Sequence, residues 1–354
     1  MSGDDVISAD DYVRTRRRRL IIIAIIFVIS LLIALRSVSV SSFRISFEEA
    51  FEVIMRNLRG EGQGNIEDTI IFEWALPRAI AGLIIGAILG VSGAVMQYCV
   101  RNPLADPYTT GISSAALFGV TIHLALGISL FPTLLGQPAT IVNAFLFSMI
   151  PCIVMVIISV RKKTTPTLLI LIGIAVMYMF SALTMIIKYN AEPEVLNQIL
   201  EWSIGSLGRI RWESIVPLSI TLLFLIIFML CFSKKLDVIS AGENMSVSLG
   251  VNPTRTRLIC MIVISACTSI AVAFSGSIGF VGLIIPHISR LLVGSKTNML
   301  IPCSAVLGAL LLVCSDTVSR MFGAELPVGA VTALIGSPIF LYFLFKIRTN
   351  GWGK

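Results

Sequence analysis

Two short patterns in this sequence could place a nucleophile or a phosphate-binding loop. Gly90–Gly93 reads G-V-S-G, a spacing in which an intramembrane serine could act as a nucleophile, with His123 or His287 as its base. Ser92 also continues a face of small residues, so helix packing explains it without chemistry. Gly294–Thr297 reads G-S-K-T and resembles the end of a phosphate loop. It lacks the upstream glycine and the adjacent Gly-Lys, so it does not predict a nucleotide site.

Ionisable and sulfur-containing residues are the other candidates for chemistry. Asp316 lies in an apolar run, where a carboxylate is a functional hypothesis by default. Arg320 follows four residues later, so an ion pair on one helix face explains it equally well. Two histidines and seven cysteines, with no C-x-x-C or H-E-x-x-H pattern, predict no metal site. The cysteines lie in or beside apolar runs and are odd in number, which indicates free, buried thiols. The sequence predicts no catalytic residue.

Composition defines the elements that hold these residues. Of 354 residues, 56% are hydrophobic and 13% charged, which is typical of a multi-pass membrane protein and excludes a soluble domain. No span is rich in ionisable residues, as an ion-coupled carrier usually requires. We therefore expect a transporter whose energy source is a separate protein. A secondary transporter that works alone is the alternative from another class.

The predicted fold is all-α, with about ten transmembrane helices. Ten apolar runs are long enough to cross a bilayer or come close to it. They lie near residues 20–35, 76–99, 110–130, 139–160, 167–188, 213–232, 256–275, 278–293, 299–318 and 327–346.

The distribution of charge predicts the orientation of these spans. With both termini in the cytoplasm, 18 of the 27 lysines and arginines fall on the cytoplasmic side, as the positive-inside rule requires. The net charge of +7 therefore follows membrane topology and does not indicate nucleic-acid binding. We expect a basic cytoplasmic tail over residues 1–19, a transmembrane domain over 20–348 and a cytoplasmic tail over 349–354.

Small residues recur at every fourth position of the second span, at Gly82, Gly86, Gly90 and Ala94. This spacing predicts close approach of another helix in the membrane. The apolar run ends at Arg101, and the prolines of the following segment, 101–107, forbid simple continuation of the helix. The pattern indicates a tightly packed helix that ends in a compact polar turn, which could serve as a gate.

Two short helices are predicted outside the spans. Ser46 and Glu49 form a capping box ahead of an amphipathic stripe. In the cytoplasmic segment 236–254, Ser240 is positioned to cap a helix with Glu243 as its third residue. We also expect Met245 and Leu249 on one face of this helix, Gly250 as its C-terminal stop and Pro253 beyond it.

Several segments resemble the permease family of bacterial ABC importers for iron–siderophores, haem and cobalamin, the FecCD or BtuC type. They occur in family order over most of the chain, and they include LPR at 76–78, SGAVMQ at 92–97, RNPLADP at 101–107, SALT at 181–184, WSIGSL at 202–207, GENMSVSLGV at 242–251, GSIGFVGLIIPHISRLLVG at 276–294, LGALLLVCSDTVSR at 307–320 and ELPVGAVTALIGSPIFLYFL at 325–344. The sequence departs from the family pattern at Ala75, where an arginine is frequent, and at Ser277, where proline is common.

The resemblance implies a ten-span permease of the cytoplasmic membrane that carries a ferric siderophore, with haem or cobalamin as alternatives. It implies a homo- or heterodimer of permeases, two ATP-binding subunits that hold ATP and Mg, and an extracytoplasmic substrate-binding protein. This chain itself is expected to bind no cofactor and to contact only protein partners and lipid.

The resemblance also assigns roles to residues. The gate at the cytoplasmic mouth would comprise Asn102, Pro103, Leu104, Thr165, Pro166 and Thr167. The binding protein would dock on Arg78 and Arg320. Coupling to the ATPase would use Ser240, Gly242, Glu243, Met245, Leu249 and Gly250.

Overall fold

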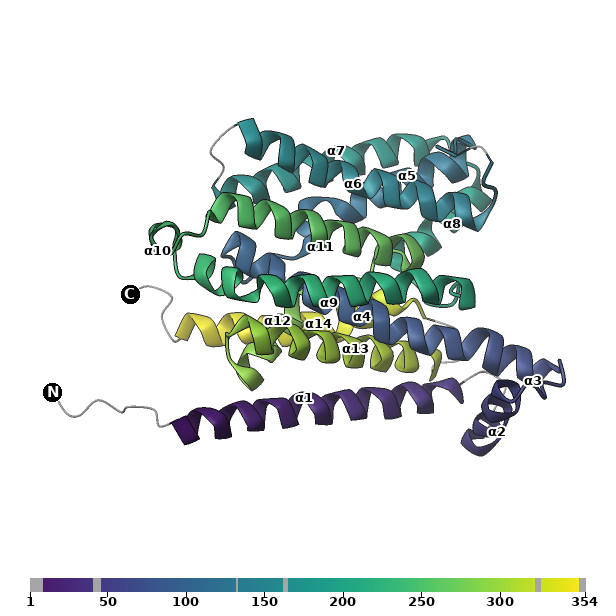
Figure 1. Ribbon diagram of the computed structural model, residues 1–354. Helices are drawn as coiled ribbons and strands as arrows, with labels where there is room; N and C mark the ends of the chain where they lie inside the picture. The colour runs from purple at the N-terminus through teal and green to yellow at the C-terminus, as the bar shows by residue number, and fades with distance from the viewer. Residues whose placement is uncertain (1–8, 41–45, 132, 162–164, 322–325, 350–354) are drawn as a thin grey trace.

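A computed structural model describes residues 9–40, 46–131, 133–161, 165–321 and 326–349. Within these ranges every regular element is a helix. Figure 1 shows a bundle in which α1 lies along one edge and α7 along the opposite edge. The prediction of an all-α membrane protein is confirmed.

Ten apolar helices correspond to the ten predicted spans. Seven are long enough to cross a membrane: α1 (Ala9–Val38), α4 (Leu76–Val100), α6 (Gln137–Arg161), α7 (Pro166–Tyr189), α9 (Trp212–Ser240), α11 (Pro253–Ser275) and α13 (Thr297–Met321). The other three have shorter apolar segments: α5 (Ile112–Leu126), α12 (Val281–Val293) and α14 (Val328–Thr349). The helix α1 begins at Ala9, so part of the predicted N-terminal tail already belongs to the first helix.

Left-handed backbone positions explain why two of the spans are short. Gly127, with φ +67°, ends α5 and its N–H bonds to the His123 carbonyl. Gly276, with φ +72°, ends α11, and Phe280, with φ +69°, precedes α12. A left-handed residue stops the helical hydrogen-bond ladder. The segment between α11 and α12 is therefore unwound, and α12 begins three residues later than the hydrophobic run predicts.

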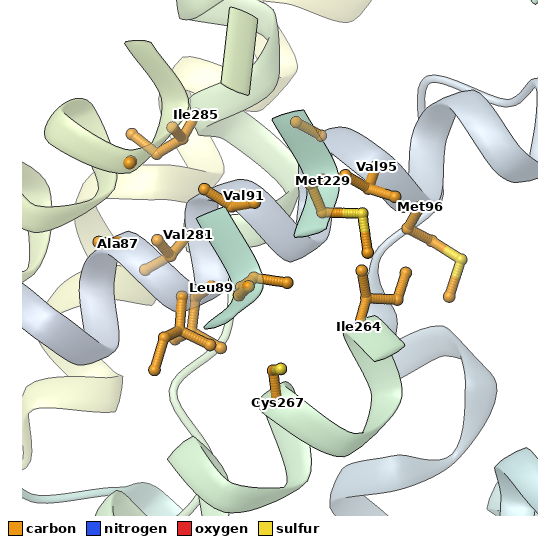
Figure 2. Packing of buried hydrophobic residues seen from close by; sticks show 14 of the residues in the cluster. Ala87, Leu89, Val91, Val95, Met96, Met229, Ile264, Cys267, Val281 and Ile285 are labelled. Atoms are coloured by element: carbon orange, nitrogen blue, oxygen red, sulfur yellow. The ribbon is translucent and has the colours of Figure 1, made fainter. Parts of the chain in front are cut away.

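The helix α4 lies at the centre of the bundle. All but three of its residues are buried, and it packs against α9, α11, α12 and α13. Figure 2 shows Leu89 and Val91 of α4 close to Met229 of α9, Cys267 of α11 and Val281 of α12. A membrane helix that is apolar on all sides and enclosed by others is positioned by packing.

The small residues of α4 allow backbone contact with two neighbours. A Cβ at Gly86 would lie 2.3 Å from the Gly308 carbonyl oxygen of α13, and one at Gly90 would lie 2.2 Å from the Ser304 carbonyl oxygen. A Cβ at Gly93 would lie 2.0 Å from the carbonyl oxygen of Gly282 in α12. No side chain fits at these distances, so the predicted close approach is confirmed and its partners are α13 and α12.

One end of the bundle carries short amphipathic elements: α2 (Phe47–Leu58), α3 (Ile66–Asp68), the π-helical turn η1 (Thr69–Ala75) and α8 (Pro193–Ile204). The predicted capping box is present, because the Glu49 N–H donates to Ser46 Oγ and the Ser46 N–H to Glu49 Oε2. Ile54 of α2 packs against Ala75, which stands where the family often has arginine. Phe51 stays exposed, so only part of the predicted stripe is packed.

Figure 1 places the start of α1, the end of α14 and the short helix α10 (Glu243–Ser248) at one end of the bundle, and α2, α3 and α8 at the other. We call these the α10 end and the α8 end. From the positive-inside rule we expect the α10 end to face the cytoplasm. The start of α1 and the end of α14 lie at the same end of the bundle, as an even number of spans requires.

Cysteine labelling tests this orientation. Ser2 and Asn350 lie outside the described residues and near the two ends of the chain. In a background that lacks the exposed Cys231, Ser2→Cys and Asn350→Cys should resist a membrane-impermeant maleimide in intact cells. The control Leu135→Cys, at a leucine 82% exposed at the α8 end, should label. Labelling at position 2 or 350 without permeabilisation would contradict the ten-span topology.

Candidate functional site

The helix α10 projects from the α10 end between α9 and α11. Gly250, with φ +74°, ends it as the sequence predicts. The Gly250 N–H bonds to the Val247 carbonyl and the Val251 N–H to the Ser246 carbonyl, which together form a Schellman motif. Three apolar side chains on this short helix remain exposed: Met245 at 55%, Val247 at 65% and Leu249 at 58%. An exposed apolar cluster of this kind is typical of a protein interface.

The base of α10 is fixed by two polar contacts. Ser246 is fully buried, and its hydroxyl donates to the Val238 and Gly242 carbonyls. Arg257 of α11, only 3% exposed, donates from Nη1 to Glu243 Oε1 at 2.8 Å. These contacts tie α10 to α9 and α11.

The predicted cap at Ser240 is wrong. The helix α9 continues to Ser240, whose hydroxyl donates to its own helix at the Asp237 carbonyl. The N-cap of α10 is Gly242, which has no side chain to cap with, and Glu243 is the first helical residue. The reason is packing: Leu236 and Ile239 are fully buried, so tertiary contacts extend α9 through the predicted loop.

The turn that follows α4 is compact and well bonded. Arg101 ends the helix with φ +51°, and the Leu104 N–H donates to Asn102 Oδ1 at 2.9 Å. Asn102 and Pro103 are half-buried, whereas Leu104 is 43% exposed. The turn thus presents one apolar side chain on a stiff support, which suits a seal.

Beyond this turn, the chain packs against the unwound segment between α11 and α12. Asp106 is buried, its Oδ1 accepts from the Tyr108 N–H, and its Oδ2 lies against Gly282. Burial raises the pKa of the Asp106 carboxyl to about 6. The Tyr108 hydroxyl accepts from the Ile278 N–H, and Ser277 bonds to Ser113 of α5 through the two hydroxyls at 2.8 Å. Ser277, which stands where proline is common in the family, therefore forms a side-chain hydrogen bond that proline could not form.

The second predicted gate turn begins α7. Thr165 is the N-cap, its hydroxyl accepts from the Leu168 N–H, and Pro166 is the first helical residue. Thr165 and Thr167 are exposed. No hydrogen bond among the described residues joins this turn to Asn102. Both turns lie toward the α10 end, where the first follows α4 and the second begins α7. Within a single chain they do not form one site.

At the α8 end, the two predicted docking arginines meet one carboxylate. Arg78 Nε donates to Asp316 Oδ1 at 2.9 Å, and Arg320 Nη2 lies 3.0 Å from Asp316 Oδ2. Arg320 Nη1 also donates to the Val40 carbonyl. The exposed fractions are 7% for Arg78, 2% for Asp316 and 9% for Arg320. The expected Asp316–Arg320 pair is present, and Arg78 joins it from a position 238 residues away in the chain.

The burial of this triad changes how its docking role can be tested. Asp316→Asn would leave two buried guanidinium groups without their shared carboxylate, so it should destabilise the protein by about 3–5 kcal/mol. Arg78→Gln leaves the Asp316–Arg320 pair intact and should destabilise less. If Arg78 also contacts the binding protein, Arg78→Gln should weaken that association in protein that is still folded at the assay temperature. Surface plasmon resonance and thermal unfolding of both variants check this order, and equal destabilisation by both would contradict it.

The structure also shows polar links at the α10 end that sequence spacing did not reveal. Arg290 of α12 donates to Gln97 Oε1 of α4 at 2.6 Å. Asp237 of α9 accepts from the Thr297 N–H at the start of α13. The partners are far apart in sequence. Only the helix boundary near Thr297, where a backbone N–H has no acceptor within its own helix, could have suggested that this residue needs a partner. The first bond joins α12 to α4, which leads into the first turn, and the second joins α9 to the start of α13.

The serine-nucleophile hypothesis has no geometric support. Within the described part of the chain, the Ser92 hydroxyl has no hydrogen-bond partner. His287 is engaged with the Leu283 carbonyl of its own helix, and His123 lines a cavity at the α8 end. A serine needs an adjacent base to act as a nucleophile, and neither histidine provides one.

Comparison with known proteins agrees with this geometry. The profile described as the FecCD transport family matches residues 21–346. The chain is 38% identical to an ABC transporter permease protein of Methanocaldococcus jannaschii, MJ0087, over 93% of this chain and 96% of that protein. It is 32% identical to the molybdate import system permease protein MolB of Haemophilus influenzae, over 93% and 98%. Other relatives are named as permeases for cobalamin, iron chelatin and hemin.

A solved structure has the same fold. A transporter described as of the metal-chelate ABC type, in an inward-facing conformation, superposes with a TM-score of 0.80 at 30% identity, over 92% of this chain and 99% of that one. The fold and the projecting helix define the membrane-spanning permease of an ABC importer, a multi-pass protein of the cytoplasmic membrane. The chain belongs to the FecCD transport family. It is a transporter component and not an enzyme, because the ATPase of such a system is a separate subunit.

Proposed function

We propose that this permease imports a ferric siderophore. The main support is the structural likeness to a metal-chelate type transporter over nearly the whole chain. Relatives named for iron chelatin, iron(3+)-hydroxamate and Fe(3+)-citrate add to it. Haem and cobalamin are the alternatives within the same architecture, and molybdate is a further one because of the relative MolB.

In the proposed assembly, two permeases form the pathway along their interface, two ATP-binding subunits sit at the α10 end, and a substrate-binding protein docks at the α8 end. ATP and Mg are held by the ATP-binding subunits, and this chain binds no cofactor. The exposed side chains of α10 fit a groove on the ATP-binding subunit, in the manner of helix-in-groove recognition. Glu243–Arg257 and Ser246 then transmit the movement of α10 to α9 and α11.

Transport of a labelled panel tests the cargo. The permease is reconstituted in liposomes with its ATP-binding subunits and binding protein, and uptake of ferric hydroxamate, ferric catecholate, haem, cobalamin and molybdate is measured with and without ATP. We expect ATP-dependent accumulation of a ferric siderophore above all other compounds. Preferred uptake of haem, cobalamin or molybdate would overturn the proposed cargo and leave the assembly intact. Uptake that persists without the ATP-binding subunits would instead indicate a secondary transporter.

Cross-linking tests the gate. We expect Leu104→Cys, at an exposed position of the first turn, to cross-link across the permease dimer in at least one nucleotide state. Because Leu104 would seal the pathway by apolar contact, the cross-link should block transport while ATP hydrolysis stays measurable. Asn102→Cys should behave similarly but less completely, since its side chain is half-buried. The control is Ile66→Cys, at a site 75% exposed at the α8 end. Absence of cross-linking at both turn positions in every nucleotide state would remove them from the pathway.

A further inference from the structure

A cavity of about 340 Å³ lies at the α8 end, bounded by α5, α6, α8 and the last turn of α11. It is separate from α10, from both gate turns and from the Arg78–Asp316–Arg320 triad. Its polar and aromatic lining residues include His123, Gln137, Gln198, Glu201, Trp202 and Arg209. The volume is within the range of small-molecule sites, which combine an apolar wall with a few polar groups.

Two nitrogen atoms on the wall of this cavity lack partners. Arg209 Nη2 and His123 Nδ1 are shielded from water and form no hydrogen bond within the described residues. The main chain of Arg209 is fixed, because Gln137 Nε2 donates to its carbonyl oxygen at 3.1 Å. A shielded donor without an acceptor is unfavourable, and more so when it is charged. An acceptor bound beside these two side chains would recover that free energy.

The charges around the cavity are arranged unevenly. Among the described residues that line it, Arg209 is the only cationic one. Burial lowers the pKa of its guanidinium, while nearby Glu201 acts in the opposite direction. Arginine nonetheless stays protonated at neutral pH. Glu201 is exposed on α8, and the two residues form no ion pair within the described chain. The carboxylate of Glu201 therefore remains hydrated, and the buried cation remains without a direct counter-charge.

We propose that this cavity binds a small organic monoanion through a carboxylate. The guanidinium of Arg209 and the imidazole of His123 donate to the carboxylate oxygens. Leu124, Trp202 and Phe274 line the remaining wall and contact the apolar body of the ligand. Glu201 disfavours ligands of higher negative charge, such as a phosphate dianion, by repulsion at short range. The site stands apart from the cargo, and its test does not depend on transport.

Benzoate and its neutral isostere benzamide are suitable probes, because they differ in charge and share their shape. Isothermal titration of the purified full-length permease in nanodiscs should show benzoate binding at least about tenfold tighter than benzamide, since a hydrogen bond to a charged group contributes about 1.5–3 kcal/mol. Arg209→Gln should lower benzoate affinity about tenfold by the same reasoning. Glu201→Gln, which removes the repulsive charge, should raise benzoate affinity and leave benzamide unchanged.

The two variants should change benzoate affinity in opposite directions, which distinguishes binding at this cavity from a general structural effect. Thermal unfolding of each variant controls for folding, and Glu201→Gln lies at an exposed position where loss of the fold is not expected. Equal affinity for benzoate and benzamide would overturn the proposal. Benzoate affinity that neither variant changes, or no benzoate binding at millimolar concentration, would overturn it as well.

Discussion

Replacing Leu249 with Asp should release the ATP-binding subunits or abolish ATP-driven uptake while the permease remains folded. Leu249 is 58% exposed, so the substitution removes little packing and carries little cost to folding. In the proposed complex, the same side chain would be buried in a groove, where a carboxylate without a partner is unfavourable. Loss of such a contact costs about 2 kcal/mol or more, or about a thirtyfold loss of affinity.

Co-purification and uptake in liposomes measure this effect. The matched control is Leu135→Asp, the same substitution at a more exposed leucine at the opposite end of the bundle, which should change neither quantity. A third variant, Gly250→Val, places a β-branched residue at φ +74° and should distort the end of α10 with a similar loss of coupling. Wild-type co-purification and uptake in Leu249→Asp would refute the assignment of α10 to the ATPase interface.

Replacing Gly86 with Val should strongly destabilise the native bundle. The first added carbon would lie 2.3 Å from the Gly308 carbonyl oxygen and 2.9 Å from the Ala309 Cα. Both obstacles are backbone atoms, so no rotamer change can relieve the overlap. Over-packing of a core costs about 1–3 kcal/mol and occasionally more, and we expect the upper end here because two helices must separate.

Thermal unfolding and the monodisperse yield in detergent measure this effect. Gly279→Ala is the matched control, because a Cβ at Gly279 would contact nothing within 4 Å and its backbone needs no left-handed conformation. It should unfold at the wild-type temperature. A folded Gly86→Val permease with an unchanged melting temperature would show that α4 and α13 are farther apart than the structure indicates.

The spans and the close approach of α4 could be predicted because both depend on local composition. Hydrophobic length predicts ten membrane helices, and the repeated glycines predict a face that accepts a neighbouring backbone. The partner of that face could not be predicted, since Gly308 lies far along the chain. The same holds for Arg78, whose carboxylate partner belongs to α13. Spacing rules predict contacts between residues three or four positions apart in the sequence. They do not predict contacts between residues that only folding brings together.

The cap at Ser240 and the helix α8 show two further limits. Residue types predict a cap at Ser240, but burial of Leu236 and Ile239 decides where α9 ends. The helix α8 contains Glu194, Gln198 and Glu201, which interrupt its hydrophobicity, so a search for membrane spans passes over it. Its start at Pro193 and its stop at Gly205 are nevertheless ordinary helix boundaries, and a search for amphipathic helices could have found it.

The glycine contact between α4 and α13 also bears on movement. Two helices whose backbones touch cannot rotate or slide past each other by a fraction of a turn, because there are no side chains between them to change rotamer. The part of the α5–α7 seam beyond the first turn of α5 differs, since the rings of Phe118 and Phe180 pack across it with centroids 5.3 Å apart. Large rings can repack in discrete steps, as helix shear requires. We therefore expect α4 and α13 to travel as one rigid body during alternating access, with the sliding surface at the aromatic seam.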